Sequence, residues 1–192
     1  MDFFVAYLKM GFEHISDIKG YDHMLFIIIL CSVYKITEWK KVAILITAFT
    51  IGHSTTLALS ALKIIITNSA LIEVLIPVTI LFTSLANLFY NTDAKPKNIN
   101  YNYWLALIFG FIHGMGFSNF FNALMGDSMN IIYPLFAFNV GLELGQLLIV
   151  AMFFALYFAV NKLFKIEQKS WILFISGMGA GISLIMILER IK

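Results

Sequence analysis

Five long apolar runs constrain the fold of this chain more than any other feature of its sequence. They are 18 to 27 residues long, and about 20 residues suffice for an α-helix to cross the hydrocarbon core of a bilayer. The runs cover residues 42–62, 71–90, 103–124, 134–160 and 171–188. Hydrophobic residues make up 60% of the chain and charged residues 12%, a balance that does not suit a soluble domain. The sequence therefore predicts an all-α fold, a polytopic bundle of transmembrane helices.

The first 34 residues hold two less regular segments. Residues 21–34 are apolar but few for a span, and we count them as the first of about six spans. Residues 3–18 have apolar side chains at helical spacing and charged residues on other faces, which predicts an N-terminal amphipathic or re-entrant helix. The sequence leaves open whether this helix crosses the bilayer. The whole chain, residues 1–192, is then a single integral membrane domain.

Basic residues in alternate loops predict the orientation, because loops rich in lysine and arginine stay in the cytoplasm. With six spans, the side with more basic residues collects Lys35, Lys40, Lys41, Lys95, Lys97, Lys162, Lys165 and Lys169. The other side has Lys9, Lys19, Lys63, Arg190 and Lys192. We therefore expect both termini to lie outside the cytoplasm.

Charge and cysteine content exclude two classes of interaction. The formal net charge is only +2, and the basic residues lie in loops without forming a patch that could hold nucleic acid. Cys31 is the single cysteine, which excludes a disulfide within the chain. The expected surroundings are the lipid bilayer, and the sequence leaves a homo-oligomer or a partner subunit open.

All four histidines lie in the outer halves of the expected spans or at their outer ends, and carboxylates accompany them. Asp22 precedes His23, and Glu143 lies inside an apolar run with Asn139 and Gln146 on the same helical face. Ionisable groups in hydrocarbon are costly and usually face a protein interior. The candidate metal ligands are His14, Asp22, His23, His53, His113 and Glu143, with Ser54, Asn139 and Gln146 as supporting polar groups.

Loop charge and helical rise place these groups at similar depths. We expect His23, His53, His113 and Glu143 to converge in a cavity open toward the outside, with His14 at its mouth. Each motif also has a purely structural interpretation. Asp22 could cap a helix start, His53 could belong to a hydrogen-bonding stripe, and glycines beside His113 could serve helix packing. A membrane scaffold held together by polar residues is the corresponding alternative function.

In their order along the chain, these motifs resemble the HupE/UreJ family of bacterial membrane proteins. The resemblance covers nearly the whole chain and rests on residues 11–26, 49–54, 109–117 and 138–146. It implies a permease in the bacterial inner membrane that is associated with nickel and serves hydrogenase or urease maturation. It also implies that the metal-handling motifs of the family correspond to His14, Asp22, His23, His113 and Glu143.

Two departures indicate the second branch of that family. Seven residues separate His14 from Asp22, more than in the better studied nickel branch. That branch also has a second histidine a few residues after the one that matches His113, where this chain has Met115, Gly116 and Phe117.

Two functions of different classes follow. The favoured one is a membrane permease for a divalent transition metal, nickel first and zinc or cobalt as alternatives, which passes the ion through an intramembrane site of histidines and carboxylates. The alternative is an intramembrane metal-dependent hydrolase. In it, a permanently bound zinc-like ion activates water, with Glu143 or Asp22 as general base. The metal is the substrate in the first case and a resident ion in the second, and the family resemblance decides the order.

Overall fold

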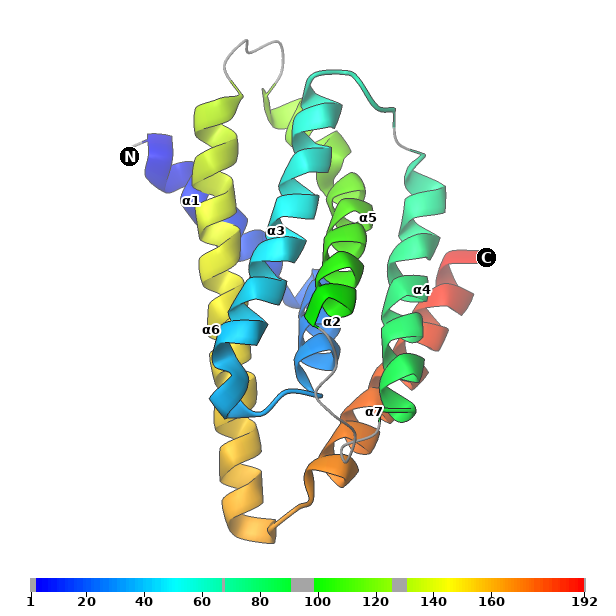
Figure 1. Cartoon of the computed structure of the whole chain (residues 1–192). Coiled ribbons are helices and arrows are strands. Elements are labelled where there is room, and N and C mark those ends of the chain that lie inside the picture. Colours follow the sequence, from blue (N-terminus) through cyan, green and yellow to red (C-terminus); the bar gives the residue numbers. More distant parts are fainter. Residues whose placement is uncertain (1–2, 67, 91–98, 126–130, 192) are drawn as a thin grey trace.

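The structure, a computed structural model, describes residues 3–66, 68–90, 99–125 and 131–191 (Figure 1). Within these ranges the chain is all helical and has no strand, as predicted. The α-helices are α1 (Phe3–Ser16), α2 (Asp22–Cys31), α3 (Trp39–Ala61), α4 (Ser69–Leu88), α5 (Ile99–Met125), α6 (Ile132–Phe164) and α7 (Gln168–Ile191). Short 3-10 turns at Ile18–Gly20 and Ile36–Glu38 precede α2 and α3. Lys95, Lys97 and Lys192, which contribute to the predicted orientation, lie outside the described residues.

Five of the described helices, α3 to α7, are long and apolar enough to cross a membrane. They coincide with the five apolar runs of the sequence and extend each by a few residues at one end or both. The reason for the agreement is that a helix makes its backbone hydrogen bonds internally, so its length and apolarity decide whether it can span the hydrocarbon core. The chain is an integral membrane protein.

The expected first span differs from the other five. Residues 21–34 contain only α2, whose 10 residues are too few to cross a bilayer alone. Figure 1 shows α1 running obliquely past α6 and α3 and ending inside the bundle, where α2 begins and continues toward the opposite end. The two helices are separated by the 3-10 turn that ends at Gly20. Five long helices and one broken segment therefore replace the six continuous spans.

The bundle is built from three closely packed helix pairs, α1 on α6, α3 on α5 and α4 on α7. Glycines allow the backbones of the first two pairs to touch. A Cβ atom on Gly11 would lie 1.9 Å from the Phe138 carbonyl oxygen, and one on Gly52 would lie 2.2 Å from the Leu107 carbonyl oxygen. Small residues are the usual means of close helix contact in membranes. Here they bring the helices that carry His14, His53 and His113 against their partners.

Candidate metal site

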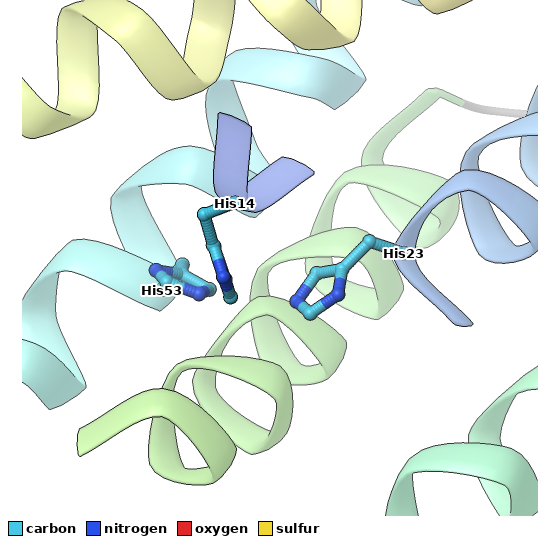
Figure 2. Close-up of side chains that lie close together, drawn as sticks. All are labelled: His14, His23 and His53. Atoms are coloured by element: carbon cyan, nitrogen blue, oxygen red, sulfur yellow. The ribbon is translucent and has the colours of Figure 1, made fainter. Parts of the chain in front are cut away.

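Three of the four histidines meet inside the bundle. His14 lies in the last turn of α1, His23 in the first turn of α2 and His53 near the middle of α3. One ring nitrogen from each of the three can be chosen so that all lie within 4.8 Å of one another. Figure 2 shows the three rings turned toward a common centre, and we call these residues the three-histidine group.

The break between α1 and α2 creates this geometry. In a continuous helix, residues nine positions apart would be separated by about 13 Å along the axis. Because the chain turns at residues 18–20, the end of α1 faces the start of α2, and the rings of His14 and His23 are 4.8 Å apart between centroids. The corresponding distances to His53 are 5.6 Å from His14 and 6.0 Å from His23.

Five buried ring nitrogens of the site have no hydrogen-bond partner among the described protein groups. These are both nitrogens of His53 and the Nε2 atoms of His14, His23 and His113. His53 and His113 are fully buried. A buried polar atom without a partner costs about 1–3 kcal/mol, so several of them in one place indicate a site for an external ligand.

The second nitrogen of His23 is held by a carboxylate. His23 Nδ1 donates to Asp22 Oδ1 at 2.9 Å, and the backbone N–H of His23 donates to the same oxygen at 2.9 Å. Because a carboxylate only accepts, Nδ1 carries the proton and Nε2 of the neutral ring has a lone pair. Asp22 therefore orients His23, as carboxylates that accept the N–H of a metal-binding histidine usually do.

His113 has the same arrangement with a different acceptor. Its Nδ1 donates to the Phe109 carbonyl oxygen at 2.8 Å, which leaves a lone pair on the buried Nε2. The ring lies 5.1 Å from that of His23, between centroids, and is flanked by Phe26 and Phe49. His113 thus borders the three-histidine group without belonging to it.

Two cavities reach the group. The first has a volume of about 580 Å³ and is lined by residues of α1, the following turn and α5, including Glu13, His14 and Asp17. The second, of about 210 Å³, is lined by His14, His23 and His113 together with Asp17, Asp22, Glu73 and Arg190. His14, Asp17 and Phe117 border both cavities.

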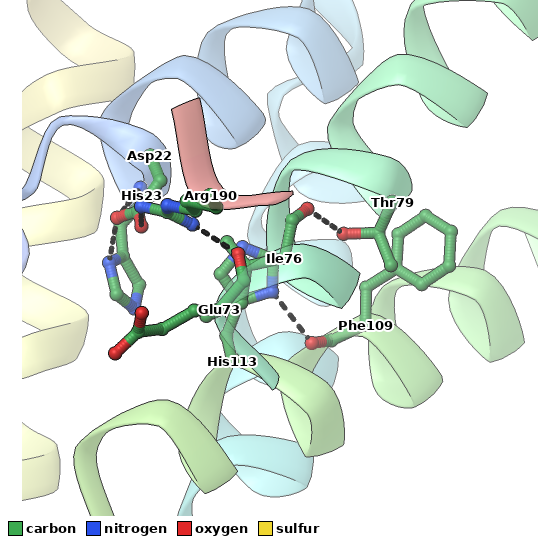
Figure 3. A network of polar contacts seen from close by, with 8 residues as sticks. All are labelled: Asp22, His23, Glu73, Ile76, Thr79, Phe109, His113 and Arg190. Carbon is green, nitrogen blue, oxygen red and sulfur yellow. Dashed lines mark hydrogen bonds and ion pairs between the residues drawn. The ribbon is translucent and has the colours of Figure 1, made fainter. Parts of the chain in front are cut away.

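Glu73 and Arg190 are cavity residues that sequence reasoning missed. Arg190 Nη2 lies 3.4 Å from Asp22 Oδ2, and Arg190 Nη1 donates to the Glu73 carbonyl oxygen at 2.5 Å (Figure 3). In the sequence, Glu73 stands near the start of the apolar run 71–90, where a charged residue at the membrane interface is ordinary. The signal that could have found this contact is Pro77, because a proline leaves the carbonyl four residues before it without a helical donor.

The polar residues expected on the apolar run 134–160 lie at the α3–α6 contact and outside the three-histidine group. Glu143 Oε1 accepts a hydrogen bond from Thr47 at 2.7 Å, and Gln146 Oε1 accepts one from Thr50 at 2.8 Å. The buried Oδ1 atom of Asn139 has no partner among the described groups. Ser54 donates to the Thr50 carbonyl oxygen of its own helix at 2.6 Å.

The arrangement can bind a transition-metal ion through neutral imidazoles. Two nitrogens that both ligate a tetrahedral ion at 2.0–2.1 Å are about 3.3 Å apart. The nitrogens of the group spread over as much as 4.8 Å, so the rings must approach one another to bind an ion, or the ion must keep some of its water.

Comparison with known proteins gives one match. A family model described as HupE / UreJ protein matches residues 1–190. No curated protein and no solved structure matches the chain. The family is associated with the uptake of nickel or cobalt. Because the match covers nearly every residue, including all those of the site, this chain belongs to the HupE/UreJ family.

Proposed function

We propose that the protein is a permease for a divalent transition-metal ion, with nickel as the first candidate and cobalt or zinc as alternatives. The observation that carries the proposal is the three-histidine group, in which both nitrogens of His53 and the Nε2 atoms of His14 and His23 are buried without a protein partner. Imidazole is a suitable ligand for all three metals. The family's association with nickel and cobalt uptake supports the same class of substrate.

The two cavities supply the outer part of the route. The ion enters the larger cavity beside Glu13 and Asp17, exchanges part of its water at His14 and meets His23 and His113 in the smaller one. The fully buried His53 completes the three-histidine group that binds it. Stepwise exchange keeps any single set of ligands from holding the ion too tightly to leave. Asp22 contributes by orienting His23.

In this proposal Glu143 is the next residue that binds the ion along its route. Its partner Thr47 lies six residues before His53 on α3, which is about 9 Å along the helix axis. In the orientation expected from the lysine distribution, this direction leads to the cytoplasm. Glu143 would therefore receive the ion after the histidines, with Gln146 and Thr50 fixing the adjacent turn of the α3–α6 contact.

The family resemblance supports a location in the bacterial inner membrane, and the lysine distribution supports an orientation with both termini outside the cytoplasm. The broken segment α1–α2 then serves as the sixth crossing, with its break at the binding site. Discontinuous helices of this kind form the ion sites of many secondary transporters.

Flux measurements test the proposal. Purified protein in liposomes that contain a metal-sensitive dye should give saturable influx of Ni²⁺, Co²⁺ or Zn²⁺. His23→Ala and His53→Ala should each lower the rate at least about tenfold, because each removes one imidazole of the group. Glu167→Gln, a change at an exposed residue just before α7, is the control and should transport normally. Absence of flux for all three ions would contradict the permease.

The hydrolase alternative predicts a different result. It requires about one ion per chain to remain after extensive washing, and a chelator that removes the ion to stop the turnover of a lipid or peptide substrate. A permease loses its ion on washing and carries it across the membrane. Metal content after washing therefore separates the two functions.

A further inference from the structure

Pro77 leaves one carbonyl of α4 without its helical hydrogen bond. In an α-helix the N–H of residue i+4 donates to the carbonyl of residue i, and proline has no N–H. The carbonyl affected is that of Glu73, four residues before Pro77 inside α4. Arg190 Nη1 donates to it at 2.5 Å, so the last turn of α7 supplies the donor that α4 lacks.

The other arm of the same guanidinium reaches the metal site. Arg190 Nη2 lies 3.4 Å from Asp22 Oδ2, while Asp22 Oδ1 accepts from His23 Nδ1 at 2.9 Å. Figure 3 shows the chain of contacts running from α7 through Asp22 to His23. Asp22 is thus shared between a guanidinium group, which stays charged, and the histidine that faces the proposed ion.

Arg190 also faces the space that the ion must enter. It lines the smaller cavity together with His14, His23 and His113, whose Nε2 atoms have no protein partner. The Arg190 side chain is 27% exposed, whereas that of Asp22 is 11% exposed. A divalent cation at His23 repels the guanidinium and attracts Asp22.

We propose that Arg190 is a tethered competitor of the transported ion. Without an ion, its guanidinium occupies Asp22; when a divalent cation binds at His23, the guanidinium leaves Asp22 and keeps its contact with the Glu73 carbonyl. Its return to Asp22 favours release of the ion. This inference rests on the proposed transport function, and Arg190 acts in it as a positioning residue, through Asp22 and without touching the ion.

A competitor of this kind meets a requirement of transport. Imidazoles oriented by a carboxylate hold transition metals well, yet a transported ion must also leave. A positive group fixed to the protein weakens binding at every concentration of ion and is present at each release. When the guanidinium has left Asp22, the Glu73 carbonyl oxygen remains as its hydrogen-bond acceptor.

Charge variants of Arg190 test the inference through two separate quantities. Arg190→Gln and Arg190→Met remove the charge, and Arg190→Lys keeps it. We expect the two neutral variants to bind Ni²⁺ about tenfold more tightly in calorimetric titrations, and their maximal flux in liposomes to be about tenfold lower. The lysine variant keeps the charge but loses the two-armed guanidinium, so its Kd should lie between those of the wild type and the neutral variants. Lys169→Gln, at the other, exposed end of α7, is the control and should change neither quantity.

A measurement on the unaltered protein complements the variants. Arg190 is the only arginine of the chain, so the rate of its modification by phenylglyoxal, followed by mass spectrometry, reports on this one side chain. Bound Ni²⁺ should raise that rate several-fold, because the guanidinium leaves Asp22. A rate that stays the same or falls would overturn the inference, whether or not the variants fold.

The possible results separate this inference from the function on which it rests. If Arg190 only stabilises the fold, the neutral variants will lose affinity and flux together, and the inference fails while wild-type transport stands. An unchanged Kd in both neutral variants has the same consequence. Wild-type protein that neither binds nor transports Ni²⁺, Co²⁺ or Zn²⁺ would overturn the transport function and the role of Arg190 with it.

Discussion

His53 is the side chain of the site with the greatest unmet need for hydrogen bonds, because both of its ring nitrogens are buried and neither has a protein partner. Neighbouring aromatic rings, among them Phe49 and Phe138, surround it and offer no hydrogen bond. Such a residue destabilises the empty protein and is useful only when something binds to it. Stability and binding should therefore respond in opposite directions when it is replaced.

His53→Leu tests that opposition. In metal-free protein the variant removes two unsatisfied buried nitrogens, which should stabilise the fold by about 1–3 kcal/mol and raise Tm by several degrees. Added Ni²⁺ should raise Tm of the wild type and leave that of the variant unchanged, because a ligand stabilises only the protein that binds it. A variant that melts lower than the metal-free wild type would contradict this account of His53.

Asp22 should matter for binding without being required as a ligand. Asp22→Asn keeps the size of the side chain but removes the charge that holds His23 Nδ1–H and faces Arg190. The Kd for Ni²⁺ should increase about 10–100-fold, the usual effect of losing a carboxylate that orients a metal-binding histidine. Calorimetric titration measures this, with the exposed Glu189→Gln as control. An unchanged Kd would show that His23 does not depend on Asp22.

At the scale of elements, the sequence predicted the five long helices well and the first segment poorly. The long helices follow from apolar length, which neighbouring helices do not alter. The end of α1 inside the bundle depends on its contact with α6, where Gly11 and Gly141 let the two backbones touch. That tertiary contact brings His14, which lines both cavities, into the three-histidine group as well.

Two other contacts of the site that the sequence did not predict also depend on how separate helices pack. Glu143 faces Thr47 of α3, a relation between two helices that residue spacing along one helix does not determine. Arg190 lies 168 residues from Asp22 in the sequence, and their contact follows from the packing of α7 on α4. The sequence therefore allowed candidate polar residues to be named, but it did not show which residues they contact.

The glycine contact between α1 and α6 gives a test at this scale. Gly11→Ala would place a Cβ atom 1.9 Å from the Phe138 carbonyl oxygen, so α1 must move and take His14 with it. We expect Tm to fall and the Kd for Ni²⁺ to rise at least about tenfold. The matched control is Gly177→Ala in α7, which meets no atom within 4 Å and should bind normally. Equal behaviour of the two variants would mean that the position of α1 does not matter for the site.

At the scale of the whole molecule, the broken segment decides how many times the chain crosses the bilayer. If α1 and α2 together form a crossing, Lys9 and Lys35 lie on opposite sides of the membrane. Membrane-impermeant maleimide should then label Lys9→Cys from outside intact cells and Lys35→Cys only after the membrane is opened. The native Cys31 is fully buried and should not interfere. Labelling of both positions from the same side would contradict the crossing and the predicted orientation.

The central claim is that His14, His23 and His53 bind the transported ion at the break between α1 and α2. The position of a bound Ni²⁺ or Co²⁺ ion, located by its anomalous scattering in crystals grown with the metal, tests this most directly. We predict one strong peak within about 2.0–2.3 Å of a ring nitrogen of each of the three histidines. An ion bound elsewhere, or no ion at metal concentrations that support flux, would contradict it.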